Sequence, residues 1–273
     1  MNIGKFRYAG KRVLVVGAAT GMGAAAAETV AALGAELVVM DVADITYPAK
    51  QIARIDLRSR DSVDAAIDQV TQPVDVLLLC AGVADGTKGL MAINFISQRH
   101  IVRRLVANGL LVRGGAIVMI SSVAGLSWQR NLAMTQDFLE TPDWDSAVAW
   151  VAAREGTDCY AFSKMAMNTY IAQEAFPLLK QGIRINAILP GPTDTPLARA
   201  NAELWLGFGA GYRAAAGVPT LTPQQMANVM AFLGSDAASG VSGITLTVDQ
   251  GHVASGITGS FSDPGVRMAL GQA

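Results

Sequence analysis

Short runs of apolar residues recur along the chain, and they alternate with longer stretches in which apolar residues return at helical spacing. The short runs predict buried strands, and they lie at residues 13–16, 37–40, 51–55, 75–80, 115–120, 183–189 and 244–248. The longer stretches predict helices, and they lie at residues 24–33, 60–70, 88–109, 157–180 and 222–233. Pro177 and Gly182 are expected to end the fourth of these helices. This alternation predicts an α/β fold with a doubly wound parallel sheet.

The first apolar run ends in a glycine-rich turn that leads directly into the first predicted helix. Gly17 permits a sharp exit from the strand, Gly21 permits close approach of the backbone to phosphates, and Gly23 permits close packing of helix on sheet. The first amides of the helix have no partners within it, so with the helix dipole they favour an anion such as a pyrophosphate. The spacing is a variant of the dinucleotide fingerprint, and we include Thr20 and Met22 of the same turn among the cofactor-binding residues.

Acidic residues follow the second and third predicted strands. Asp41 lies where an acid would bind the hydroxyls of the adenosine ribose, although capping of a strand-end turn is the alternative. Its carboxylate would repel a 2′-phosphate, and Ala18 and Ala19 stand where a basic residue would bind one, so NAD is preferred over NADP. Asp56, followed by Leu57, is expected near the adenine amino group, with a solvated turn as the alternative.

Composition narrows the class of protein further. With 273 residues, 51% of them hydrophobic, the chain can form a single domain over residues 1–273 with a large core. A net charge of −1 without a basic stripe argues against nucleic-acid binding, and no apolar run approaches the length of a membrane span or a signal peptide. Cys80 and Cys159 suggest no disulfide framework and a cytoplasmic location, and His100 and His252 lack the spacing of metal ligands, so we expect no metal site.

Candidate acid–base chemistry lies in the fourth predicted helix, where Tyr160 and Lys164 share one face because they are four residues apart. A free tyrosine with a pKa of about 10 is a poor acid or base at neutral pH, but a nearby cation favours the phenolate. Tyr160 could then exchange a proton with an alcohol or a carbonyl. Ser122, after the fifth strand, could orient the substrate oxygen, and Asn94 could hold a water that connects Lys164 to solvent. Chance placement of a buried tyrosine and a surface lysine is the alternative.

Taken in order, these motifs resemble the short-chain dehydrogenase/reductase family. The resemblance implies a Rossmann-type, NAD(P)-dependent oxidoreductase acting on CH–OH groups, with Asn94, Ser122, Tyr160 and Lys164 as its catalytic set. The resemblance also includes three further family motifs, which are Cys80-Ala81-Gly82, Pro190-Gly191 and the run from Val248 to Gly251. It implies that Thr193 and Thr195 contact the nicotinamide end of the cofactor. Tyr160 and Lys164 are also expected to contact the cofactor.

Departures from the family pattern point to one of its branches. Cys80 replaces the usual asparagine, the loop from Cys80 to Asn94 is short, and an insertion of about residues 127–154 separates Ser122 from Tyr160. These features are similar to the bacterial 3α-hydroxysteroid dehydrogenase/carbonyl reductase branch. In that branch the insertion is helical and blocks the usual helix-to-helix subunit interface. We expect a homodimer or a homotetramer.

The substrate is expected to be apolar. Residues 196–218 are rich in small and apolar side chains and lie where the family has its substrate lid, and glycines 207, 209 and 211 would let such a lid move. We therefore expect a bulky apolar alcohol or ketone, hydroxysteroids included, although a subunit contact is another use for this segment. Residues 253–273 are left open as a lid, an interface arm or a disordered tail. The alternative functions are dehydrogenation of a small cyclic alcohol or dihydrodiol, and a non-catalytic NAD-binding module.

Overall fold

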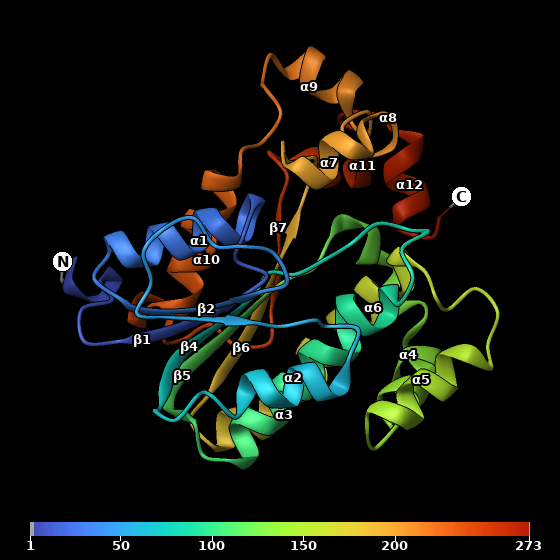
Figure 1. The fold of residues 1–273 in the computed structure, drawn as a ribbon. Helices are drawn as coiled ribbons and strands as arrows, with labels where there is room; N and C mark the ends of the chain where they lie inside the picture. The colour runs from blue at the N-terminus through green and yellow to red at the C-terminus, as the bar shows by residue number, and fades with distance from the viewer. Residues whose placement is uncertain (1–2, 273) are drawn as a thin grey trace.

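The computed structural model describes residues 3–272, and its centre is a seven-stranded sheet in which every pairing is parallel (Figure 1). The strand order is β3-β2-β1-β4-β5-β6-β7. The strands are β1 (Arg12–Val16), β2 (Glu36–Asp41), β3 (Gln51–Arg54), β4 (Val74–Leu79), β5 (Leu111–Ile120), β6 (Arg184–Pro190) and β7 (Thr245–Val248). The predicted doubly wound parallel sheet is confirmed, and β5 begins earlier than the sequence indicated.

Helices cover both faces of the sheet, which explains why its central strands are almost continuously apolar. In β1, Val13 and Val15 pack with α1 (Gly21–Ala32) and α10 (Pro223–Gly234). Leu14 and Val16 point to the other face, which is covered by α2 (Arg60–Ile67), α3 (Ser97–Ala107) and α6 (Tyr160–Lys180). Short 3-10 turns lie beside α10 on the first face, at η1 (Ile3–Phe6), whose Phe6 stacks with Phe232, and at η4 (Asp236–Ala238).

The order of the strands creates a crevice between β1 and β4. From β1 the chain runs outward to β2 and β3, and then returns to pair β4 with the other side of β1. The connections that leave β1 and β4 therefore diverge, and a crevice opens at the carboxyl ends of these strands. The amide of Cys80 donates to the carbonyl of Val16 at 2.8 Å, so the two strand ends stay in register up to this point.

The helix predicted at 60–70 ends at Ile67, and two other predicted helices also differ from expectation. The helix predicted at 88–109 contains a π-helical turn, η2 (Ala92–Ile96), before α3 begins. The helix predicted at 157–180 begins at Tyr160, and Pro177 does not end it: α6 continues to Lys180. Proline removes a bond to the carbonyl four residues earlier. Both Pro177 and Gln173 are exposed, so water can take the place of the missing donor.

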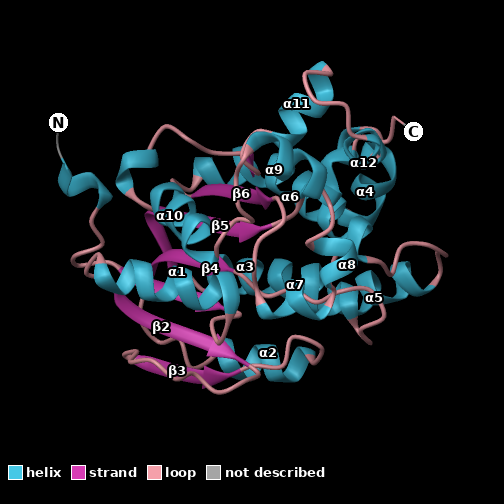
Figure 2. Cartoon of the chain, turned by 90° about the horizontal axis from the view of Figure 1, so that it is seen from above, coloured by secondary structure: helices cyan, strands magenta, loops and turns pink. Residues whose placement is uncertain are grey.

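The predicted insertion is helical. It follows η3 (Val123–Gln129) and contains α4 (Leu132–Leu139) and α5 (Trp144–Ala152). Trp150 stacks with Phe162 of α6, and Phe138 packs against both rings at a tilt. The buried Arg99 of α3 donates to the carbonyl of Leu139 and the hydroxyl of Thr141. Seen from above, α4 and α5 lie on the side of the molecule away from the N-terminus (Figure 2).

Short helices stand beyond the carboxyl edge of the sheet (Figure 1). Three form the predicted lid segment, and two belong to the C-terminal tail, which is therefore helical over most of its length. These are α7 (Pro196–Ala200), α8 (Ala202–Trp205), α9 (Ala210–Ala216), α11 (His252–Thr258) and α12 (Pro264–Ala269). Over residues 3–272, no helix combines the length and the apolar character that crossing a bilayer requires.

Candidate active site

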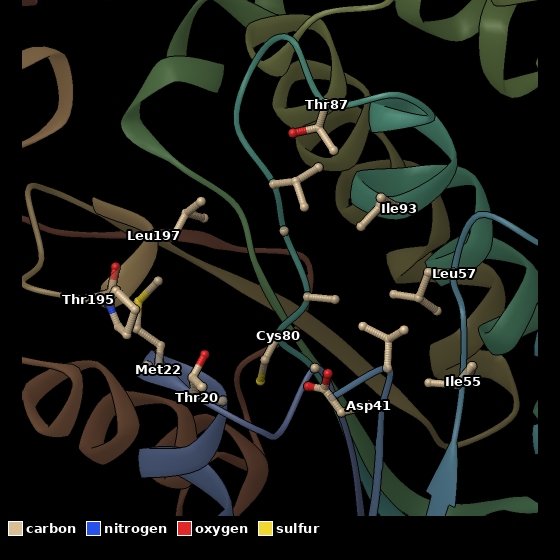
Figure 3. Close-up of a pocket in the computed structure, with 18 of the residues that line it drawn as sticks. Thr20, Met22, Asp41, Ile55, Leu57, Cys80, Thr87, Ile93, Thr195 and Leu197 are labelled. Carbon is tan, nitrogen blue, oxygen red and sulfur yellow. The ribbon is translucent and has the colours of Figure 1, made fainter. Parts of the chain in front are cut away.

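A cavity of about 420 Å³ occupies the crevice at the carboxyl ends of β1 and β4 (Figure 3). The side chain of Met22 reaches toward Thr195 on one side, while Thr87 and Ile93 come from the opposite wall. Many of the predicted cofactor-binding residues line this cavity: Gly17, Thr20, Gly21, Met22, Gly23, Asp41, Asp56, Leu57, Cys80, Ala81, Gly82 and Thr195. The sequence motifs therefore meet at one place in the fold.

The glycine turn is packed so tightly that larger residues do not fit. Gly17 has φ +82°, and a Cβ on it would lie 2.4 Å from the amide nitrogen of Ala81. A Cβ on Gly23 would lie 1.8 Å from the carbonyl oxygen of Gly17. Thr20 caps α1 without a side-chain hydrogen bond to its amides, so the first turn of α1 keeps its donors for a ligand in the cavity. This arrangement fits the pyrophosphate of a dinucleotide.

Asp41 holds the turn as well as lining the cavity. One carboxylate oxygen accepts from the amide of Ala19 at 2.8 Å, and the other accepts from the amide of Ala43 at 2.9 Å. Tyr47 supports the same turn, because its hydroxyl donates to the carbonyl of Ala18 at 2.6 Å. Each carboxylate oxygen of Asp41 retains acceptor capacity for a ribose hydroxyl. Asp41 can therefore cap the turn and bind the adenosine ribose at the same time.

Asp56 lines the cavity but is engaged with Arg58. The Arg58 guanidinium donates from Nε and Nη2 to the Asp56 carboxylate at 2.9 and 2.7 Å. These hydrogen bonds lower the pKa of Asp56 from its ordinary value. Sequence reasoning placed Asp56 near the adenine amino group, with a solvated turn as the alternative, and did not identify Arg58, which lines the same cavity.

The predicted catalytic lysine lies deep beside the cavity. Lys164 is buried, and its Nζ donates to the carbonyl of Ile120 at 2.8 Å. The same atom stands 5.4 Å from the ring centroid of Tyr160, one turn earlier on α6. A Cβ on Gly82 would lie 3.8 Å from both Lys164 Nζ and Asn94 Oδ1. The structure thus brings Lys164 and Asn94 together beside Gly82, which lines the cavity, with Tyr160 next to Lys164.

Burial dominates the acid–base properties of this group. It raises the pKa of Tyr160 to about 12, against the lowering influence of a hydrogen bond with Ser122 and together with the negative charge of Asp85. Burial lowers the pKa of Lys164 to about 7. The expectation that Lys164 lowers the pKa of Tyr160 is therefore not met in the protein alone, because a buried lysine carries only part of its charge near neutral pH.

Asn94 lies in the π-helical turn and is fully buried. Its side chain accepts from the amide of Val83 at 2.8 Å and donates to the carbonyl of Val83 at 3.0 Å and to Ser163 Oγ at 3.3 Å. Both of its donor hydrogens are used, while Oδ1 keeps one lone pair. Asn94 therefore ties the segment after Gly82 to the helix that follows the short loop.

Gln98, one turn after Asn94, is a positioning residue that sequence reasoning missed. Its buried Nε2 lies 2.9, 3.2 and 3.0 Å from the carbonyl oxygens of Ala81, Ile93 and Asn94, so its two hydrogens are shared among three acceptors. A π-helical turn shifts the helical bonding pattern, and the amide of Gln98 supplies donors to carbonyls in and beside that turn. Only knowledge of the π-helical turn would have revealed this role, since glutamine is unremarkable in a helical sequence.

Other predicted residues lie outside the cavity lining. Ser122, Tyr160, Lys164 and Asn94 are not part of the lining, although Lys164 and Asn94 lie next to Gly82, which is. Pro190, Gly191 and Thr193 lie at the end of β6, where Thr193 Oγ1 donates to the carbonyl of Gly191 at 2.9 Å. Of the two threonines expected at the nicotinamide end, only Thr195 lines the cavity. The lining also includes residues that no motif marked: Val42, Ile55, Val83, Thr87, Ile93, Pro196 and Leu197.

Comparisons with known proteins place the chain in a family. The family described as short chain dehydrogenase matches residues 11–134, and the one described as Enoyl-(Acyl carrier protein) reductase matches residues 145–252. The chain is 32% identical to the 3-alpha-hydroxysteroid dehydrogenase/carbonyl reductase of Comamonas testosteroni, over 88% of this chain and 95% of that protein. It is also 32% identical to the cis-4-hydroxycyclohexanecarboxylate dehydrogenase of Sinomonas cyclohexanicum, over 90% of this chain and 98% of that protein.

A solved structure shares the fold. The 3-alpha-hydroxysteroid dehydrogenase from Pseudomonas sp. B-0831, complexed with NADH, superposes with a TM-score of 0.72 at 22% identity, over 93% of this chain and 100% of that chain. The motifs, the cavity and the similarity of sequence along nearly the whole chain lead to one conclusion. The chain belongs to the short-chain dehydrogenase/reductase family, whose members bind NAD(P)H and act as oxidoreductases on alcohols.

Proposed function

We propose that this protein is an NAD-dependent oxidoreductase that interconverts a secondary alcohol and a ketone on a bulky apolar substrate. The observation that carries the proposal is the placement of two groups at one cavity. The glycine turn and Asp41 line the cavity, and Lys164 lies next to Gly82, another residue of the lining, together with Tyr160 and Ser122. A dinucleotide on the turn would then bring its reactive ring toward the tyrosine.

The preference for NAD rests on Asp41. The residue lines the cavity after β2, beside the turn that would hold the pyrophosphate, and its charge opposes a 2′-phosphate. Arg58 lines the same cavity, but its guanidinium is paired with Asp56. An arginine that is already paired with a carboxylate is less available to bind the 2′-phosphate of NADP than an unpaired one. We therefore assign NAD as the cofactor.

Proton transfer is assigned to Tyr160. When bound, the nicotinamide ring supplies the hydride acceptor for alcohol oxidation and the hydride donor for ketone reduction. In alcohol oxidation the phenolate of Tyr160 would take the proton from the alcohol, and in ketone reduction the hydroxyl of Tyr160 would return it to the ketone oxygen, while Ser122 Oγ would hydrogen-bond the same oxygen. The positive charges of the oxidised ring and of protonated Lys164 oppose the effect of burial and favour the phenolate.

Lys164 and Asn94 are assigned to the path of the proton. A lysine whose pKa is lowered to about 7 by burial exchanges its proton readily near neutral pH. Asn94 Oδ1 lies on the same side of Gly82 as Lys164 Nζ and keeps a lone pair for a relay water. We propose that the proton leaves Tyr160 by this route.

The apolar substrate is supported by the lid and by the relatives. Leu197 lines the cavity, and Trp205 of α8 packs on Tyr160. The two relatives at 32% identity carry names that describe dehydrogenation of ring alcohols, one a steroid and one a cyclohexane carboxylate. The second of these keeps a small cyclic alcohol as the alternative substrate.

The test is a panel of alcohols followed by nicotinamide absorbance with NAD and with NADP. Steroid, terpenoid and small cyclic secondary alcohols are compared with a primary alcohol as control. We expect turnover with NAD on bulky cyclic secondary alcohols. Turnover limited to small alcohols would reject the bulky apolar substrate in favour of a small alcohol. NADH binding without any turnover would favour a non-catalytic NAD-binding module.

A further inference from the structure

The aromatic ring of Tyr160 is covered by a lid residue. Trp205, at the end of α8, packs against it with ring centroids 4.9 Å apart and an interplanar angle of 44°. This separation is typical of a direct aromatic pair. No substrate ring fits between the two side chains at that distance. An alcohol that reaches the face of Tyr160 covered by the indole must therefore displace Trp205.

The lid is fixed on either side of α8. Before it, Thr195 caps α7 by accepting from the amide of Ala198 at 3.0 Å. After it, the ring of His252 lies between Phe208 and Tyr212, with centroids 5.0 and 4.8 Å away. His252 Nε2 also lies 2.7 Å from an oxygen of Asp263 in the tail. The C-terminal tail thus anchors the far side of the lid.

Between these anchors, α8 has little burial of its own. Leu204 is 73% exposed, and none of the residues of α8 is fully buried. Arg213 binds the next turn, donating to the carbonyls of Phe208 and Leu206. A short helix with few buried contacts, held by firm neighbours on both sides, can move locally without disrupting the fold. The contact of Trp205 with Tyr160 is therefore a local one that a ligand can replace.

We propose that Trp205 determines specificity by covering Tyr160 until an apolar ring displaces it and then packing against that ring. This inference rests on the proposed function. Every substrate bears the same cost of uncovering Tyr160, because only the uncovered form binds productively. A large flat ring recovers contact with the indole, whereas a small aliphatic alcohol does not. The substrate class implied is a secondary alcohol on a fused or multiple ring.

Kinetics of Trp205→Ala and Trp205→Phe test the proposal. The measured quantity is kcat/KM for a fused-ring secondary alcohol divided by kcat/KM for 2-propanol, with NADH affinity as the control for folding. We expect this ratio to fall about tenfold in Trp205→Ala, which follows from loss of an aromatic contact, and to be largely retained in Trp205→Phe. Equal changes for both alcohols, or an unchanged ratio, would overturn the proposal.

A second measurement needs no turnover. A fused-ring ketone is added to the complex with NAD⁺, a pair that cannot react, and tryptophan fluorescence is followed. We expect a change in emission that Trp205→Phe abolishes and that Trp144→Phe, in the insertion, retains. A response that persists in Trp205→Phe, or no response in the wild type, would overturn the proposal. A fluorescence response in a protein that oxidises no alcohol would instead reject the proposed function alone.

Discussion

Replacing Gly23 by alanine would break the turn that holds the cofactor. The added Cβ would lie 1.8 Å from the carbonyl oxygen of Gly17 and 3.0 Å from Cys80 Cβ. The first of these atoms is backbone at the end of β1, so it cannot rotate away. Overpacking of this kind costs about 1–3 kcal/mol or more. At roughly 2–4 °C per kcal/mol for a chain of this size, the melting temperature would fall by about 6–12 °C at the upper end of that range.

Two other glycines serve as controls for this substitution. Gly10 has φ +79° with nothing within 4 Å of an added Cβ, so Gly10→Ala isolates the backbone cost of about 1–2 kcal/mol. Gly21 has φ +59°, and its nearest neighbour, Thr195, is 3.5 Å away, so Gly21→Ala should also remain folded. Because Gly21 lines the cavity, its new methyl group should weaken NADH binding at least tenfold.

Thermal unfolding and an NADH fluorescence titration separate these cases. We expect Gly23→Ala to lose stability and binding, Gly21→Ala to lose mainly binding, and Gly10→Ala to lose only a little stability. If Gly23→Ala melts like Gly10→Ala, the packing argument is wrong. If Gly21→Ala binds NADH as tightly as the wild type does, the pyrophosphate does not lie on this turn.

Three further substitutions test other parts of the site. Asp41→Asn removes the charge that opposes a 2′-phosphate, so the ratio of kcat/KM with NADP to that with NAD should rise about tenfold or more; an unchanged ratio would reject the assignment of NAD. Asp85→Asn removes a negative charge that raises the pKa of Tyr160 but keeps an acceptor for the backbone amide of that residue, 2.6 Å away. A lower pKa forms the phenolate at lower pH, so the rise of alcohol oxidation with pH should move to lower pH; no movement, or movement upward, would contradict this reasoning. Gln98→Leu removes the side-chain donor to the carbonyl of Ala81 and should lower the free energy of unfolding by about 1–3 kcal/mol, measured by urea denaturation. Leu at the exposed Gln181 should change it little, and equal effects would remove the special role of Gln98.

The strands were the most predictable feature of the chain. Val13 to Val16, Val76 to Leu79 of β4 and Ala187 to Leu189 of β6 are apolar because both faces of the sheet are covered there, and such runs are visible without a structure. The boundaries of helices were less predictable, because they depend on partners far along the chain. Pro177 remains inside α6 because the preceding turn is exposed to water while Leu178 is buried.

The cofactor end of the site was predicted better than the substrate end. Gly17, Gly23 and Asp41 follow backbone constraints that leave a mark in the sequence. The contacts of Trp205 with Tyr160 and of Gln98 with the carbonyl of Ala81 join residues that are distant in sequence. No sequence motif marks either pair. Burial also reversed the expected direction of the Tyr160 pKa, because sequence shows which charges are near but not how far water is excluded.

The most direct test of the proposed function is the substitution Tyr160→Phe, measured beside Tyr170→Phe. Both tyrosines belong to α6, and Tyr170 packs in the core against Phe95. We expect Tyr160→Phe to bind NADH like the wild type and to lose about 10²–10⁴ in kcat for alcohol oxidation, since general acid–base catalysis contributes that much. Tyr170→Phe should retain turnover. Wild-type kcat in Tyr160→Phe would contradict the assignment of Tyr160 as the proton-transferring group, and with it the mechanism proposed for this protein.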